Sequence, residues 1–108
     1  MELLVHEKHD GYGEFPLLAK GARVSDLVAG TDDEFRHWFP CVIEGIMTFV
    51  PEVFVTDGVL NCDYNPTELV VNEGDIVEFL AMVFEWVLVR DGRGNEGWLP
   101  ASKVVTRR

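Results

Sequence analysis

The chain has 108 residues and a formal net charge of −10, and hydrophobic residues make up 47% of it. This length fits one ordinary domain or two very small ones, and the apolar content is typical of a folded protein rather than a disordered tail. The acidic balance argues against nucleic-acid binding and against binding to anionic membrane surfaces, because both depend on Lys and Arg.

The sequence carries no sign of membrane insertion, secretion or a disulfide framework. No apolar run approaches the roughly 20 residues that span a bilayer. The start of the chain, residues 1–13, lacks the basic and long apolar regions of a secretory signal. Two cysteines are too few for a disulfide framework. We therefore expect a cytoplasmic protein.

Short strands are predicted throughout the first half of the chain. Their expected positions are Glu2–His6, Ala22–Val28, Arg36–Ile43 and Ile46–Val50. Residues 6–20 are polar and broken by glycine and proline, as in a long loop. Pro40 cannot donate to a strand ladder, so we expect a bulge or an edge position there, and Pro51 ends the last of these strands.

The last quarter of the chain predicts a β-hairpin. Trp86–Arg90 and Glu96–Leu99 have strand character and flank a glycine-rich turn at residues 91–95. Pro100 ends the second strand. Trp86 and Trp98 should lie on neighbouring strands near this proline. An aromatic pair beside a rigid proline suits an extended ligand.

Landmarks of the first half recur in the same order in the second half, which indicates an internal repeat. Gly21 and Gly74 are 53 residues apart, Trp38 and Trp86 are 48 apart, and Pro51 and Pro100 are 49 apart. The drift in spacing indicates loops of different length. We therefore expect two copies of one unit, residues 1–55 and residues 56–108, without a flexible linker between them.

The second copy resembles a Src homology 3 (SH3) domain in the run Leu60–Tyr64, in Glu68–Asp75, and in the Trp86 hairpin with Pro100. The whole chain resembles the bacterial proteins built of two variant SH3 domains. This resemblance implies an all-β fold with two small five-stranded SH3-like barrels packed in tandem. It also implies a non-catalytic interaction module that binds extended peptide segments, proline-containing and basic ones included.

The resemblance implies one aromatic groove in each copy. The first groove would contain Tyr12, Trp38, Pro51 and Phe54. The second would contain Tyr64, Trp86, Trp98 and Pro100, with Lys103 where the family usually has an aromatic residue. The acidic residues Asp32, Asp33 and Glu34 lie just before Trp38 and would orient a basic side chain of the ligand.

A surface for contact between the copies is also predicted. Residues 81–84 are apolar where the family's second loop is normally polar. We expect Met82, Val83 and Phe84 to be buried against the first copy or a second chain, because an exposed apolar loop requires a partner. The expected partner is a protein or peptide, and the chain itself is expected to be a monomer or a weak homodimer.

Two other functions stay open. One is a bacterial SH3-type repeat that binds cell-wall peptides, although the missing export signal counts against it. The other is an accessory subunit of an enzyme. Residues 6–10 lack the helical spacing of a zinc protease, and nothing marks Cys41 or Cys62 as a nucleophile. We therefore expect no enzyme activity, no cofactor and no metal.

Overall fold

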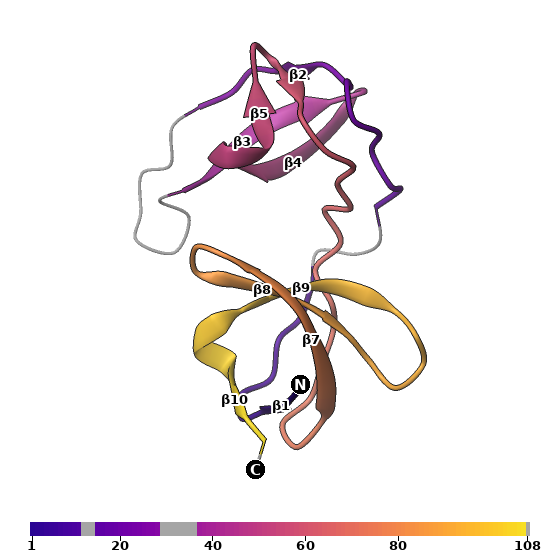
Figure 1. Ribbon diagram of the computed structural model, residues 1–108, viewed down its shortest axis with the longest axis vertical. Coiled ribbons are helices and arrows are strands. Elements are labelled where there is room, and N and C mark those ends of the chain that lie inside the picture. The colour runs from indigo at the N-terminus through magenta and orange to yellow at the C-terminus, as the bar shows by residue number, and fades with distance from the viewer. Residues whose placement is uncertain (12–14, 29–36, 108) are drawn as a thin grey trace. The chain divides into compact units, whose positions relative to one another are not determined.

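The structure, a computed structural model, describes residues 1–11, 15–28 and 37–107. Over these residues the protein is all-β, with two single 3-10 turns (Figure 1). The strands are β1 (Glu2–Val5), β2 (Val24–Ser25), β3 (Trp38–Ile43), β4 (Ile46–Pro51), β5 (Val55–Thr56), β6 (Val59–Leu60), β7 (Ile76–Val83), β8 (Trp86–Arg90), β9 (Glu96–Pro100) and β10 (Val104–Thr106). The 3-10 turns are η1 (Glu52–Phe54) and η2 (Ala101–Lys103).

Contacts divide the chain into two compact units. Unit 1 contains Met1–Glu14 together with Thr67–Arg108, and unit 2 contains Phe15–Pro66. This division differs from two consecutive halves that meet between residues 55 and 56, because the first strand joins the last third of the chain. In sequence, unit 2 is therefore inserted between the first strand of unit 1 and the remainder of that unit.

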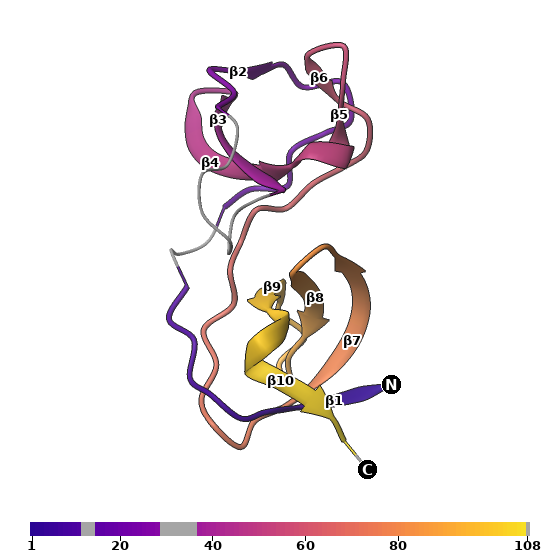
Figure 2. The same ribbon diagram turned by 90° about the vertical axis from the view of Figure 1, so that its left-hand side faces the viewer.

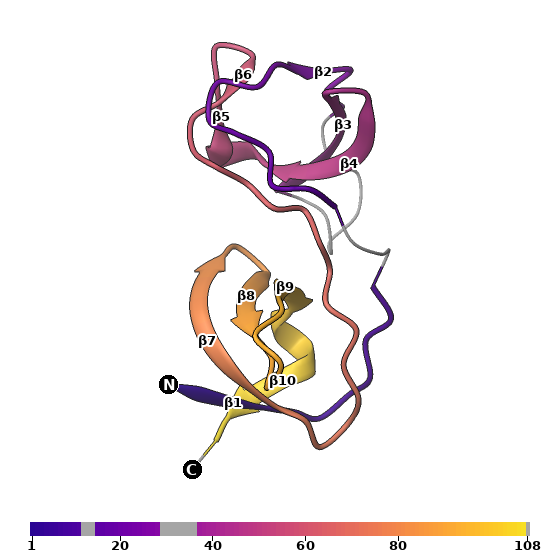
Figure 3. The ribbon, with the colours of Figure 1, turned by 90° about the vertical axis from the view of Figure 1, so that its right-hand side faces the viewer.

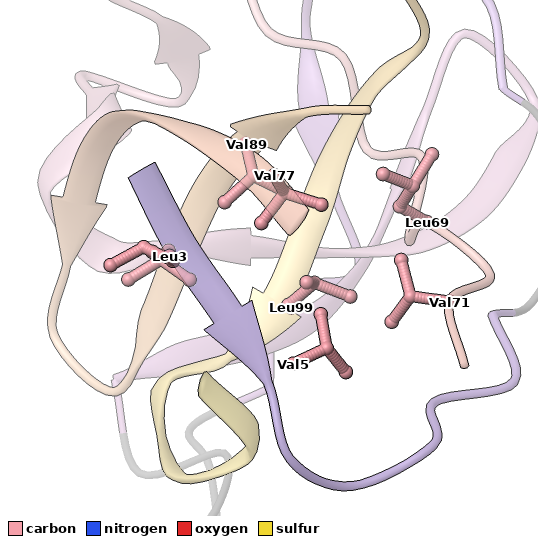
Figure 4. Close-up of a cluster of buried hydrophobic side chains, with 8 residues drawn as sticks. Leu3, Val5, Leu69, Val71, Val77, Val89 and Leu99 are labelled. Atoms are coloured by element: carbon pink, nitrogen blue, oxygen red, sulfur yellow. The ribbon is translucent and has the colours of Figure 1, made fainter. Parts of the chain in front are cut away.

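Unit 1 contains a five-stranded antiparallel sheet in the order β10-β1-β7-β8-β9 (Figure 2). Leu3 of β1 pairs with Val77 of β7 on one side and with Thr106 of β10 on the other. Its core side chains come from β1, from the strands β7 to β9 and from residues 69–71 (Figure 4). Val5 and Leu99 are fully buried in this core. Strand β1 is thus an interior strand of unit 1.

Unit 2 contains a three-stranded sheet, β2-β3-β4, and a separate two-stranded sheet, β5-β6 (Figure 3). The ladder between β2 and β3 covers only the pairs Val24–Ile43 and Ser25–Val42. Pro40 lies beyond the end of this ladder, and its carbonyl accepts a hydrogen bond from the Val28 N–H at 3.0 Å. Within the described residues the β2 ladder ends before Pro40, so on that side of β3 no ladder bond requires the N–H group that proline lacks.

The leading strands β1 and β6 occupy equivalent positions in the two units. Val5 donates to the carbonyl of Asp75 at 2.9 Å and accepts from the Gly74 N–H at 2.8 Å. Leu60 makes the same two bonds in unit 2, donating to Ala22 at 2.9 Å and accepting from Gly21 at 2.8 Å. The two glycines have nearly the same positive φ, 94° and 93°. The leading strand of each sequence copy therefore lies in the unit that is otherwise built from the other copy.

The hairpin and the 3-10 turn after it are repeated as well. Trp38 lies opposite Pro51 in the β3–β4 ladder, and Trp86 lies opposite Pro100 in the β8–β9 ladder. Each proline directly precedes a three-residue 3-10 turn. The predicted equivalence of the two tryptophans and of the two prolines is confirmed.

The ladders differ between the units in extent. Unit 1 joins its strands into one five-stranded sheet, whereas unit 2 divides its strands into sheets of three and two. Over the described residues neither arrangement closes on itself. The coarse expectation of an all-β protein is met, while closed five-stranded barrels are not present in these ladders.

Candidate functional site

Unit 2 brings Trp38, Phe54 and Tyr64 together beside Pro51, and we call these residues the aromatic cluster. The Tyr64 ring centroid lies 6.4 Å from that of Trp38 and 5.5 Å from that of Phe54, in an edge-on arrangement with the latter. The Tyr64 hydroxyl donates to the carbonyl of Phe49 at 2.7 Å. Aromatic pairs at these separations have the offset and edge-on geometry that aromatic rings favour.

Local backbone structure holds each ring of the aromatic cluster in place. Tyr64 exchanges two backbone hydrogen bonds with Leu18, at 2.7 and 2.8 Å. Trp38 is the first residue of β3, opposite Pro51, and Phe54 is the last residue of η1. The proline ends β4 and begins this 3-10 turn, so the turn directs Phe54 back towards Tyr64.

Exposure separates the members of the aromatic cluster. Trp38 and Tyr64 expose only 4% and 3% of their surface, and Pro51 is fully buried. Phe54 is half-buried. The aromatic surface that a ligand can reach in this cluster therefore belongs mainly to Phe54, with the indole and phenol rings packed behind it.

Unit 1 has the same backbone but different side chains around its tryptophan. His9 lies 5.9 Å from Trp86, edge-on, in the place that Tyr64 has in unit 2. Lys103 ends η2, as Phe54 ends η1. Trp86 and Trp98 each expose 3% of their surface. The residue equivalent to Tyr64 is therefore a histidine in unit 1, and the residue equivalent to Phe54 is a lysine.

In unit 1, ionisable side chains take the places of Tyr64 and Phe54, while Trp86 has the place of Trp38. His9, Glu68 and Lys103 form what we call the ionisable cluster. His9 Nε2 lies 3.1 Å from Glu68 Oε1, and Lys103 Nζ lies 3.4 Å from His9 Nδ1 and 3.0 Å from the carbonyl of Lys8. The side chains of His9 and Glu68 are only 10% and 11% exposed.

The ionisable cluster has a defined direction. An ammonium group has only donors, so in its contact with Lys103 the Nδ1 atom of His9 is the acceptor, while Nε2 faces the Glu68 carboxyl group. The cluster thus runs from the Lys103 amino group through the imidazole ring of His9 to the carboxyl group of Glu68. Sequence reasoning did not find it, because His9 is 59 residues from Glu68 and 94 from Lys103.

The predicted binding residues are grouped differently from the expectation. Tyr64 lies with Trp38 in unit 2, not with Trp86, because the strand that precedes it, β6, belongs to unit 2. Trp98 is buried in β9, where its backbone N–H donates to Thr67 at 2.9 Å and its carbonyl accepts from Leu69 at 3.2 Å. Tyr12, Asp32, Asp33 and Glu34 lie outside the described residues.

The predicted contact residues lie at the end of β7 and in the turn after it. Met82 is 57% exposed, and Val83 and Phe84 are half-buried. Phe84 has a positive φ of 54° in the tight turn to β8. Their burial against a partner remains a prediction.

Neither cysteine has the surroundings of a reactive thiol. Cys41 is buried in β3, and this burial raises the pKa of its thiol to about 11. Burial and, to a lesser degree, the charge of Asp63 raise the pKa of Cys62, while Lys20 lowers it. A protonated thiol is a weak nucleophile and metal ligand. Cys41 is therefore a packing residue of the core, while Cys62 is only partly buried.

Within residues 1–11, 15–28 and 37–107 no group of three or more His, Cys, Asp or Glu side chains could hold a metal ion. The same part of the chain contains no helix of the length and apolarity needed to cross a membrane. Comparison of the whole chain with family models, curated proteins and solved structures finds no match.

Proposed function

We propose that the chain is a non-catalytic interaction module with two variant SH3-like units, and that unit 2 binds extended peptide segments containing proline and basic residues. The observation that carries this proposal is the aromatic cluster of Trp38, Phe54 and Tyr64 beside Pro51. Phe54 offers an apolar contact to an extended chain, and the buried Trp38, Tyr64 and Pro51 pack behind it. A proline-rich segment is already close to its bound conformation and loses little entropy on binding.

Phe54 is the first contact in this mechanism. It is the half-buried ring of the cluster, and it packs edge-on against Tyr64. The Tyr64 ring is fixed in turn by the hydrogen bond from its hydroxyl to the carbonyl of Phe49. A ring that is already fixed loses little side-chain entropy when a ligand packs on it. The ligand would therefore lie across Phe54, with the two buried rings as support.

Charge favours a basic ligand. The chain has a net charge of −10, and the exposed Glu52 is in the same 3-10 turn as Phe54. A cation over an exposed aromatic face is stabilised by roughly 0.5–1 kcal/mol, and an exposed ion pair adds about 0.2–1 kcal/mol. Together these contacts change affinity by about tenfold, which selects among peptides without being the main source of binding.

A matched pair of variants tests the proposal. Phe54→Ala removes the proposed contact, while Val53→Ala changes the neighbouring residue of the same 3-10 turn, which is 54% exposed. Binding of a proline-rich basic peptide is followed by tryptophan fluorescence and by calorimetry. Phe54→Ala is expected to weaken binding about fivefold or more, the threshold for an important interface residue, and Val53→Ala to leave it within twofold. Equal effects of the two variants, or no saturable binding by the wild-type chain, would refute the proposal.

A further inference from the structure

Unit 1 takes its leading strand from a part of the chain that is not continuous with the rest of the unit. Strand β1 lies between β7 and β10, and residues 15–66, the whole of unit 2, separate it from them in sequence. Strand β6 fills the equivalent place in unit 2 with equivalent backbone hydrogen bonds. Backbone hydrogen bonds alone therefore do not distinguish the two leading strands.

The side chains that follow each leading strand do distinguish them. His9 follows β1 and meets Lys103 and Glu68, whereas Tyr64 follows β6 and meets Phe54 and Trp38. The backbone does not require ionisable groups here, because unit 2 builds the same position from aromatic ones. Buried ionic groups usually add little stability compared with apolar residues of similar volume, and their best-attested use is to specify which segments pair.

We propose that unit 1 recognises the segment Met1–Gly11 by the ionisable cluster rather than by its connection along the chain, and that a second copy of this chain can supply that segment. The partner is thus another molecule of the same protein, and the contact is an exchange of β1 and the residues up to Gly11. Exchange of an identical element reproduces every contact of the monomer, so it is a low-cost route to a dimer.

The segment has the features that such an exchange requires. Only residues 12–14 separate the segment from Phe15, the first residue of unit 2, and the exchange moves the segment as a whole, so β1 itself stays intact. Leu3 and Val5 are 5% and 0% exposed, so an empty place in unit 1 would expose apolar core and favour refilling. Glu68 and Lys103 of the receiving unit then favour an entering segment that has a histidine at the position of His9.

Mixed disulfides between full-length chains can test the exchange. Leu4 lies opposite Val105 in unit 1, and Thr56 in β5 has the place in unit 2 that Val105 has in unit 1. One chain carries Leu4→Cys, and its partner carries either Val105→Cys or Thr56→Cys. All chains also carry Cys41→Ala and Cys62→Ser, and the two partners differ in tag size. The pairs are refolded together at high concentration and oxidised, and the mixed dimer is quantified by mass spectrometry.

We expect the Leu4–Val105 mixed disulfide to exceed the Leu4–Thr56 one at least fivefold. His9→Tyr in the chain that supplies the strand should lower this ratio at least threefold. Lys103→Met in the receiving chain, which leaves the supplied strand unchanged, should do the same. Circular dichroism confirms that each variant is folded. Absence of the Leu4–Val105 dimer, equal yields of the two dimers, or a ratio unchanged by either folded variant would overturn the proposal.

Discussion

His9 occupies in unit 1 the position that Tyr64 occupies in unit 2. His9 exchanges two backbone hydrogen bonds with Val71, at 3.1 and 3.0 Å, as Tyr64 does with Leu18. The His9 ring lies against Trp86, the first residue of β8, and the Tyr64 ring lies against Trp38, the first residue of β3. The same backbone position therefore has an ionisable side chain in one unit and an aromatic one in the other.

Two fragments of the chain, residues 56–108 and residues 15–66, should differ in stability. A fragment of residues 56–108 lacks β1, which pairs with both β7 and β10 and contributes Leu3 and Val5 to the core. We expect it to be unfolded or aggregated. Without β1, the strands β7 and β10 lose the partner strand between them, and the apolar core of unit 1 is exposed. A fragment of residues 15–66 retains β2 to β6 and should unfold cooperatively. Thermal unfolding followed by circular dichroism compares them, and a stable, monomeric fragment 56–108 would contradict the assignment of β1 to unit 1.

The sequence predicts the hairpins well and the pairing of the leading strands poorly. Glycine, tryptophan and proline have local effects on turns and strand ends, so their spacing predicts the repeat and the places of Trp38, Trp86 and both prolines. The partner of a leading strand depends on contacts across the chain. Because β1 and β6 make equivalent backbone hydrogen bonds, local pattern cannot indicate which strand enters which unit.

The candidate site, like the fold, is only partly predictable from the sequence. The aromatic residues near Pro51 could be found because Phe54 follows the proline closely in sequence. The sequence groups Tyr64 with Trp86, whereas its ring lies with Trp38 and Phe54. This place depends on β6, the strand before Tyr64, which pairs within unit 2. The ionisable cluster cannot be found from the sequence, since His9 is 59 residues from Glu68 and 94 residues from Lys103.

Gly11 should be intolerant of a side chain, because two segments approach closely at this residue. A Cβ atom on Gly11 would overlap the carbonyl oxygen of Glu68 and lie 2.8 Å from its carbonyl carbon. Gly11→Ala should therefore destabilise unit 1 by about 1–3 kcal/mol, the usual cost of overpacking. Gly92→Ala is the matched control, because nothing lies within 4 Å of a Cβ atom there. Chemical denaturation measures both variants, and equal stability of the two would show that the close approach is absent.

The two cysteines should react at different rates. Because burial raises the pKa of Cys41 to about 11, only about one thousandth of this thiol is ionised at pH 8. Iodoacetamide at pH 8 should therefore modify Cys62 well before Cys41, and the rate at Cys41 should rise with pH up to about 11. Peptide mass spectrometry measures both sites. In denaturant the difference should vanish, and equal rates in the folded protein would contradict the buried position of Cys41.

The most direct test of the proposed peptide binding compares two peptides that differ only in charge. A proline-containing peptide with Arg or Lys, and its counterpart with Glu, are titrated against the full chain while tryptophan fluorescence is followed. The salt concentration is raised over the range in which the Debye length falls from about 10 to 3 Å. We predict about tenfold tighter binding of the basic peptide at low salt and a smaller difference at high salt. Equal affinity for both peptides, or a preference that salt does not change, would contradict the account.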